Sequence, residues 1–186
     1  EAALIAGLDA GGMPAVGKHF PGHGYAATDS HLELPTDDRP LSEILRKDVA
    51  PYAAAIKAGL AAVMPAHVVY PRVDPEPAGY SRVWLQDVLR GRLGFTGLIF
   101  SDDLSMAGAS GAGDVAARAR IALAAGCDMV LLCNDPAGQE SLLESLGGVA
   151  LAAPARAERM RRRGGARDLR KSVAYRDALQ AFANLA

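Results

Sequence analysis

Residues 97–103 read GLIFSDD, an apolar run that ends in two adjacent carboxylates. Comparable apolar runs lie at residues 13–20 (MPAVGKHF), 60–68 (LAAVMPAHV) and 128–134 (DMVLLCN). Apolar runs of this length, without polar alternation, are typical of strands in a parallel sheet that is covered on both faces. The sequence therefore predicts four parallel strands, each of which leads into polar residues.

Helical patterns separate these runs. In residues 41–59 apolar side chains recur at spacings of three and four, as on one face of an amphipathic helix, and Pro51 is a candidate kink. The pattern recurs in residues 81–95, where Ser81 is a candidate N-cap, and in residues 114–126. Strands that alternate with helices predict an α/β protein.

Candidate functional side chains gather where the predicted strands end. They are Lys18, His19, His67, Asp102, Asp103 and Asn134. A doubly wound sheet and a (β/α)8 TIM barrel both place their sites at the carboxyl ends of strands. No strand leads into a phosphate-binding glycine motif, which favours the barrel. Because a complete barrel needs about 250 residues, we expect residues 1–150 to form its second half, with the other strands before Glu1.

Composition excludes several functional classes. The chain has 186 residues, half of them hydrophobic, and a formal net charge of −1. This charge gives no electrostatic basis for nucleic acid as the main partner. No apolar run approaches the ~20 residues that a membrane-crossing helix needs. Cys127 and Cys133 are too few for a disulfide framework and lack a metal-ligand spacing, so we predict two reduced cysteines in the core.

The C-terminal segment differs in character from the rest. Residues 156–171 carry eight basic side chains against two acidic ones. Aromatic residues are not interleaved with these charges, as they are in many segments that bind single-stranded nucleic acid. We therefore expect residues 151–186 to form a basic, solvated helical tail on the outside of the barrel.

The loop after the first predicted strand is rich in imidazoles. Residues 18–31 read KHFPGHGYAATDSH and hold three of the four histidines of the chain. Asp29 and His31 stand two positions apart, near enough for the carboxylate to hold one ring nitrogen and orient the other outward. Asp102 and Asp103 are neighbours on a strand and point to opposite faces, so one of the two is expected to face the barrel mouth.

Three blocks resemble one enzyme family. KHFPGHGYAATDSH, MPAHVVYPRVDPEPAGYS and GLIFSDDLSM are similar to the matching blocks of the bacterial β-N-acetylhexosaminidases of glycoside hydrolase family 3, over about residues 12–134. The resemblance implies a (β/α)8 barrel without cofactor or metal. It also implies retaining hydrolysis of terminal β-linked N-acetylglucosamine from anhydro-muropeptides, during cell-wall recycling in the cytoplasm.

The resemblance further implies roles for six residues. Asp102 matches the nucleophile, His31 the general acid/base and Asp29 the partner that orients His31, while Lys18 and His19 match residues that hold sugar hydroxyls and His67 is given a supporting substrate-binding role. The family carries further sugar-binding residues, an aspartate and arginines, in the first half of the barrel. We therefore expect little or no activity from residues 1–186 alone.

Two alternatives stay open. A half barrel exposes strand edges, so the chain is expected either to self-associate or to be a non-catalytic remnant. The second alternative is a metal-dependent barrel hydrolase, in which histidines and a carboxylate bind zinc and activate water. Its ligands would come from His19, His23, His31, His67 and Asp102. The lack of a closely spaced histidine pair weighs against it.

Overall fold

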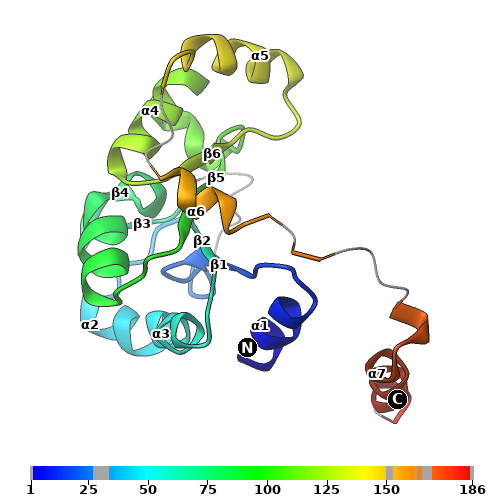
Figure 1. Cartoon of the computed structure of the whole chain (residues 1–186). Coiled ribbons are helices and arrows are strands. Elements are labelled where there is room, and N and C mark those ends of the chain that lie inside the picture. Colours follow the sequence, from blue (N-terminus) through cyan, green and yellow to red (C-terminus); the bar gives the residue numbers. More distant parts are fainter. Residues whose placement is uncertain (1, 27–33, 150–152, 162, 165–168, 185–186) are drawn as a thin grey trace.

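Four strands form one parallel sheet. The computed structural model describes residues 2–26, 34–149, 153–161, 163–164 and 169–184. The strands of the sheet are β1 (Val16–Phe20), β2 (Ala62–Pro65), β5 (Leu98–Asp103) and β6 (Met129–Leu131), in the order β1-β2-β5-β6 (Figure 1). Each of the four predicted strands is present, and neighbouring strands in the sheet are parallel.

Helices follow each strand and return the chain to the start of the next. They are α2 (Leu41–Ile44), η1 (Leu45–Val49) and α3 (Ala50–Lys57) after β1, η3 (Val83–Arg92) after β2, η4 (Ala107–Ala112) and α4 (Val115–Ala125) after β5, and α5 (Pro136–Ser145) after β6. A further helix, α1 (Ala2–Ala10), precedes β1. Four successive βα units confirm the predicted half of a (β/α)8 barrel.

Local sequence signals account for the helix boundaries. The Ser81 hydroxyl accepts the backbone N–H of Trp84 at 3.1 Å, as expected of an N-cap. The Asp114 carboxylate does the same for Ala117 at 2.7 Å at the start of α4. The helix from Leu41 to Lys57 changes to wider, π-type turns in η1, just before Pro51, which has no N–H to continue a regular ladder.

A short hairpin interrupts the second βα unit. Its strands, β3 (Val69–Tyr70) and β4 (Asp74–Pro77), are antiparallel and lead into the single turn η2 (Ala78–Tyr80). The sequence pattern did not predict it, because prolines at three positions of this segment argue against strand structure. The hairpin buries Tyr70 completely and pairs Val69 with Thr36.

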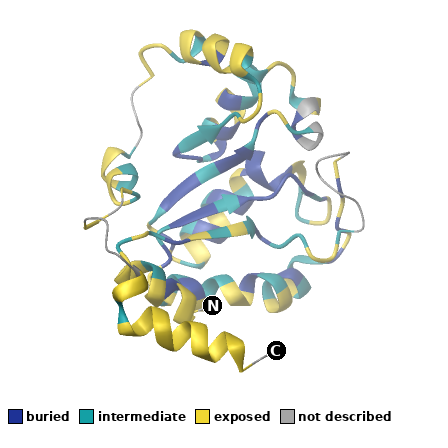
Figure 2. Cartoon of the chain, turned by 90° about the vertical axis from the view of Figure 1, so that its right-hand side faces the viewer, coloured by how far each residue is buried: buried dark blue, intermediate teal, exposed yellow. Residues whose placement is uncertain are grey.

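The core lies between the sheet and the helices. Trp84, Tyr70 and Phe20 are fully buried, with the Trp84 ring 5.0 Å from that of Tyr70 and 6.1 Å from that of Phe20. Figure 2 shows the buried positions concentrated in the sheet and on the helix faces toward it. Cys127 is buried as predicted, but Cys133 is exposed. The prediction is wrong for Cys133 because β6 ends at Leu131, before it.

The C-terminal segment contains the elements α6 (Pro154–Glu158), η5 (Leu169–Lys171) and α7 (Val173–Ala183). The predicted helices are therefore present, while the division of residues 151–186 as a separate tail stays a prediction. None of the residues of α7 is buried, and the helix stands apart from the sheet (Figure 1). Among the described residues, no helix combines the length and the apolar character that crossing a membrane requires.

A buried carboxylate, Asp128, joins elements at the amino end of β6. It accepts the backbone N–H of Ile99 at 2.8 Å, Nη2 of Arg90 at 2.9 Å and Nη1 of Arg156 at 2.7 Å. Burial, with the nearby charge of Arg156, lowers the pKa of Arg90 from its ordinary value, against the opposing effect of Asp128. The carboxylate thus holds β5, η3 and α6 together.

Replacing Asp128 should destabilise the fold. In Asp128→Asn the buried guanidinium of Arg90 loses its counter-charge, and we expect a loss of about 3–5 kcal/mol in the free energy of unfolding, measured by urea denaturation. Glu158→Gln is the control, because its pair with Arg161 joins side chains that are 66% and 79% exposed. That change should cost about 1 kcal/mol or less. Equal losses in the two variants would contradict the structural role of Asp128.

Candidate active site

Asp102 and His19 come together at the carboxyl ends of their strands. Asp102 Oδ2 lies 3.8 Å from Nε2 of His19, and Asp102 Oδ1 accepts the backbone N–H of Asp103 at 2.8 Å. His19 is on β1 and Asp102 on β5, with β2 between them in the sheet. The two side chains therefore reach each other across β2, on one face of the sheet. Asp102 is buried, with its side chain 12% exposed, and His19 is partly exposed at 31%.

Asp103 points elsewhere and has a different task. Its Oδ1 accepts the backbone N–H groups of Ser105 and Cys133, both at 2.9 Å, and its Oδ2 accepts the Ser105 hydroxyl at 2.7 Å. Burial alone would raise its pKa, but the hydrogen bonds from Cys133 and Ser105 together hold the pKa of Asp103 below its ordinary value. Asp103 thus fixes the loop after β5 to the end of β6, and Asp102 is the carboxylate that faces β1.

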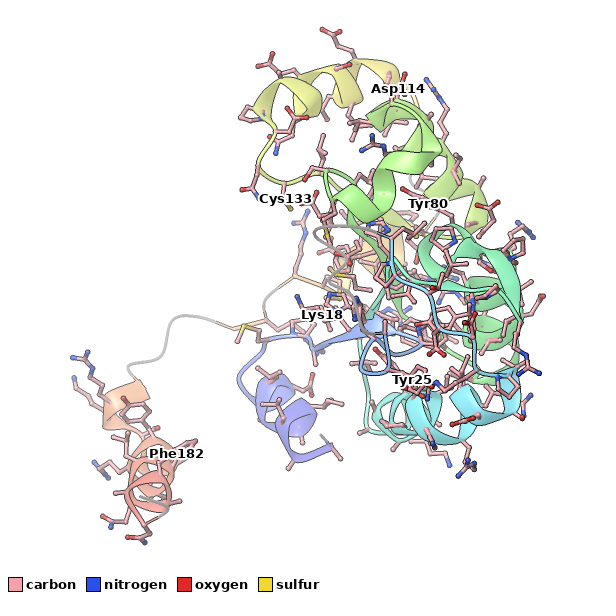
Figure 3. The ribbon with its side chains drawn as sticks, turned by 180° about the vertical axis from the view of Figure 1, so that it is seen from behind. Lys18, Tyr25, Tyr80, Asp114, Cys133 and Phe182 are labelled. Carbon is pink, nitrogen blue, oxygen red and sulfur yellow. The ribbon has the colours of Figure 1, made fainter. Side chains whose placement is uncertain are left out.

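Burial favours the neutral form of His19. Burial lowers its pKa from the ordinary value of 6.5; the Asp102 carboxylate opposes this effect, and the charges of Lys18 and the other nearby imidazoles add to it. A neutral imidazole can exchange a hydrogen bond with a hydroxyl group. Lys18, labelled in Figure 3, is exposed beside it on β1. The His23 ring lies 6.2 Å from the His19 ring, so the loop after β1 adds a second imidazole near this site.

His67 is buried behind this pair. Its Nε2 lies 3.1 Å from the backbone oxygen of Asp103. Because a carbonyl oxygen can only accept, Nε2 carries the proton, and in the neutral ring Nδ1 is then unprotonated. Burial lowers the pKa of His67, with the Asp102 charge acting in the opposite direction. The sequence predicts a supporting substrate-binding role for His67, which stays a prediction; in the structure the residue is 1% exposed and contacts the peptide that follows Asp103.

The other two expected catalytic residues, Asp29 and His31, lie outside the described residues. The structure therefore describes four of the six expected site residues, namely Lys18, His19, His67 and Asp102. Among the described residues, His, Cys, Asp and Glu side chains do not form a group of three that could hold a metal ion. The metal-binding alternative counted His31 among its ligands, and that residue is not described.

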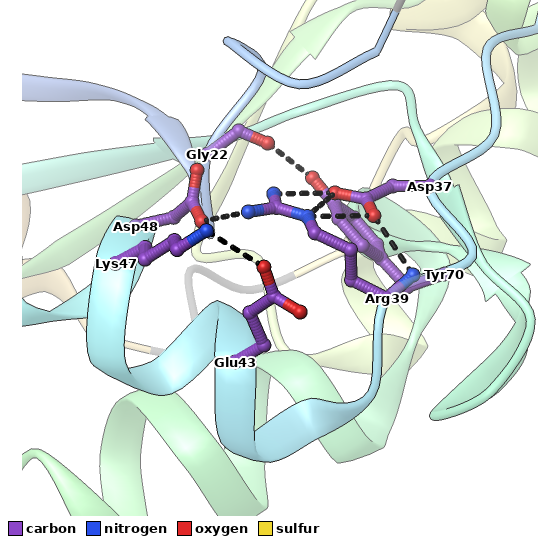
Figure 4. Close-up of polar contacts among 7 residues, drawn as sticks. All are labelled: Gly22, Asp37, Arg39, Glu43, Lys47, Asp48 and Tyr70. Atoms are coloured by element: carbon purple, nitrogen blue, oxygen red, sulfur yellow. Dashed lines mark hydrogen bonds and ion pairs between the residues drawn. The ribbon is translucent and has the colours of Figure 1, made fainter.

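A polar cluster that the sequence did not reveal lies beside the loop after β1. It consists of Asp37, Arg39, Asp48 and Tyr70, with the backbone oxygen of Gly22 (Figure 4). Arg39 follows a run of polar residues without periodicity, so neither a helix nor a strand pattern draws attention to it. The only sequence signal for this cluster was the position of Arg39, two residues after Asp37.

Comparison with known proteins assigns the family. Residues 2–162 match the glycosyl hydrolase family 3 N terminal domain. The chain belongs to this family. It is 54% identical to a beta-hexosaminidase of Pseudomonas aeruginosa (strain LESB58) over 181 residues, which cover 97% of this chain and 54% of that protein. The family predicted from the three sequence blocks is thereby confirmed.

Solved structures agree with this assignment. The crystal structure of NagZ from Neisseria gonorrhoeae in complex with N-trifluoroacetyl-D-glucosamine is similar with a TM-score of 0.84 and 44% sequence identity. The match covers 97% of this chain and 52% of that one. The structure of the same protein in complex with zinc ion has a TM-score of 0.83, at 42% identity, over 97% of this chain and 51% of that one. The chain spans about half the length of these family members.

The tautomer and charge of His67 can be measured by NMR. We expect the folded chain to show a neutral Nε2–H imidazole that titrates below the value of about 6.5 found in unfolded chains. Between the two pKa values the unfolded state binds more protons. Stability should therefore fall as the pH falls through this window, by up to about 1.4 kcal/mol per pH unit for one group. An Nδ1–H tautomer, or titration above 6.5, would show that the hydrogen bond to Asp103 is wrongly assigned.

Proposed function

We propose that this protein is a retaining exo-β-N-acetylglucosaminidase, in which Asp102 forms a covalent bond to the sugar. The observation that carries the proposal is the division of labour at the end of β5. Asp103 is engaged by Cys133 and Ser105, whereas Asp102 faces His19 across the sheet. A carboxylate at the carboxyl end of a barrel strand is where catalytic residues of this fold are found, and the family is one of glycosyl hydrolases.

The reaction follows two steps of the retaining mechanism. In the first, an oxygen of Asp102 attacks the anomeric carbon, the bond to the leaving oxygen breaks, and His31 gives its proton to that oxygen. In the second, His31 takes a proton from water, the water oxygen attacks the anomeric carbon, and the ester bond to Asp102 breaks. An imidazole with an ordinary pKa of about 6.5 can both give and take a proton near neutral pH.

The remaining residues bind and orient. We assign Asp29 to hold one ring nitrogen of His31, so that the other faces the glycosidic oxygen. Lys18 and His19 are assigned to the hydroxyl groups of the sugar. The lowered pKa of His19, caused first by burial, supports this role because a neutral ring does not form an ion pair with the nucleophile.

The substrate is proposed at two levels of detail. A relative in the same family was crystallised with N-trifluoroacetyl-D-glucosamine, an N-acylated glucosamine, which supports N-acetylglucosamine as the sugar. We further propose N-acetylglucosaminyl anhydro-muropeptides as the natural substrates and cell-wall recycling in the cytoplasm as the setting. Both rest on the family resemblance of the three sequence blocks.

The sheet has two open edges, which bear on whether residues 1–186 are active alone. Strands β1 and β6 are the edges of the four-stranded sheet, and Val16 at the β1 edge is 41% exposed. A closed barrel has no such edges. We therefore propose that substrate binding needs further strands beside β1 or β6, supplied by more of the polypeptide or by a second copy of the chain, and that residues 1–186 alone have little activity.

Covalent labelling identifies the nucleophile. The chain should be tested both alone and in a chimera in which it replaces the 181 matched residues of the Pseudomonas aeruginosa beta-hexosaminidase. A fluorinated N-acetylglucosaminyl fluoride, which reacts quickly in the first step and slowly in the second, should add one sugar to the peptide that contains Asp102. Asp102→Ala should remove both the label and the turnover of an aryl N-acetylglucosaminide.

Two controls accompany the labelling. Asp103→Asn should keep the label on Asp102 while lowering stability, because it weakens the bonds to Cys133 and Ser105. EDTA should leave labelling and turnover unchanged, whereas a metal-dependent hydrolase would lose them. Label on Asp103, or a folded chimera that neither labels nor turns over substrate, would contradict the proposed function.

A further inference from the structure

One buried arginine, Arg39, links several segments through its whole guanidinium group. Its Nε lies 3.0 and 3.1 Å from the two carboxylate oxygens of Asp37, and its Nη2 lies 2.6 Å from Asp37 Oδ2. Its Nη1 forms an ion pair with Asp48 Oδ2 at 2.8 Å. The Arg39 side chain is 8% exposed and that of Asp37 1%. Figure 4 shows the guanidinium between the two carboxylates.

The same cluster holds the segment that leads out of β1. The guanidinium carbon of Arg39 lies 4.1 Å from the centre of the Tyr25 ring, in a cation–π contact. The hydroxyl of Tyr70 donates a hydrogen bond to the backbone oxygen of Gly22. A side chain at Gly22 would collide with Asp48, so this position also requires a glycine. The described residues up to Ala26 are thus fastened to Arg39 and its neighbours.

The segment that follows residues 27–33 is fastened to the same place. The backbone N–H of Asp37 donates to Val69 at 2.9 Å, and the N–H of Val69 donates to Pro35 at 2.9 Å. Asp37 in turn binds Arg39 through two side-chain nitrogens. The chain on both sides of residues 27–33 therefore converges on one guanidinium and on strand β3, close to the end of β1 where His19 stands.

Arg39 is suited to this task by its shape and by its constant charge. The hydrogen bond to Asp37, more than any other interaction, raises the pKa of Arg39 above its ordinary value, so the side chain stays charged. A buried ion pair seldom stabilises a fold more than well-packed apolar side chains would. The buried pair of Arg39 and Asp37 is therefore better explained by the geometry that it imposes than by the stability that it adds. A lysine would keep the charge but lose the planar fork that reaches Asp37, Asp48 and the Tyr25 ring together.

We propose that Arg39 is a positioning residue for general acid/base catalysis, because it fixes both ends of the segment that contains Asp29 and His31. This inference rests on the proposed function. Arg39 does not touch the substrate in this account. It holds Tyr25 before residues 27–33 and Asp37 after them, and so limits where that segment can deliver a proton.

Leaving-group dependence separates this role from a general structural one. An acidic phenol departs without a proton, whereas a poor leaving group needs the general acid. Misplacing the acid should therefore slow poor leaving groups selectively. General acid–base catalysis contributes about 10²–10⁴-fold to enzyme rates, so in Arg39→Lys we expect kcat/KM for an aryl N-acetylglucosaminide with a poor leaving group to fall about 10- to 100-fold. With a strongly acidic phenol as leaving group, kcat/KM should be unchanged.

The measurement uses the chimera described above, and kcat/KM is the right quantity because it reports the step that forms the covalent intermediate. Arg46→Lys is the matched control: it makes the same replacement at an exposed position of the helix that contains Asp48 and should leave both substrates unaffected. Tyr70→Phe, which removes only the bond to Gly22, should change leaving-group dependence in the same direction but less. Circular dichroism checks that each variant is folded.

The outcomes are distinct. Selective loss with poor leaving groups, together with an unchanged rate of Asp102 labelling by the fluorinated reagent, supports the inference. The inference is overturned if kcat/KM falls equally for both leaving groups in Arg39→Lys and Tyr70→Phe, or if it falls in neither variant. In both cases the proposed function still stands, provided that the parent protein is labelled at Asp102. A parent protein that cannot be labelled at Asp102 overturns the proposed function, and this inference with it.

Discussion

The proposed chemistry depends on the alternation of side chains at the end of β5. Adjacent residues on an extended strand point to opposite faces, so Asp102 and Asp103 cannot serve the same site. Hydrogen bonds from Cys133 and Ser105 to Asp103 settle which carboxylate faces which way. A shift of this strand by one residue would exchange the two carboxylates and break the link between β5 and β6. Under the proposed function, the choice of Asp102 rather than Asp103 as nucleophile is a consequence of strand register.

Charge around Asp102 follows from burial of the neighbouring imidazoles. His19 and His67 both have lowered pKa values, for which burial is the first cause in each case. Protonated rings beside Asp102 would pair with its carboxylate, and such interactions are strong where water is scarce. Neutral rings leave the carboxylate free to react while still offering hydrogen bonds.

The parts of the structure that the sequence predicted are those with a local or periodic signal. Four apolar runs and the helices between them were found because burial on both faces requires continuous apolar residues, and caps such as Ser81 are local. The β3–β4 hairpin was missed because its prolines oppose strand structure. His67 follows a strand in the sequence, which suggested a place at the barrel mouth; in the structure it is buried, with its ring 5.9 Å from that of Tyr80.

The Arg39 cluster shows why the rest of the site was beyond prediction. Asp37 is near Arg39 in the chain, but Asp48 lies on the following helix, Tyr70 on the hairpin and Gly22 after β1. No spacing in the sequence brings these residues together; only the packing of the hairpin and the helix against the end of β1 does. A single strand can fix a nucleophile, because the attack involves one atom. Acid/base catalysis must reach a leaving oxygen and then a water molecule, and the residues assigned to it stand on a segment whose two ends are held by side chains from separate elements. Under the proposed function, the proton-transfer step would therefore depend on contacts from several distant elements, whereas the orientation of the nucleophile would depend on strand β5 and its bonds to Ser105 and Cys133.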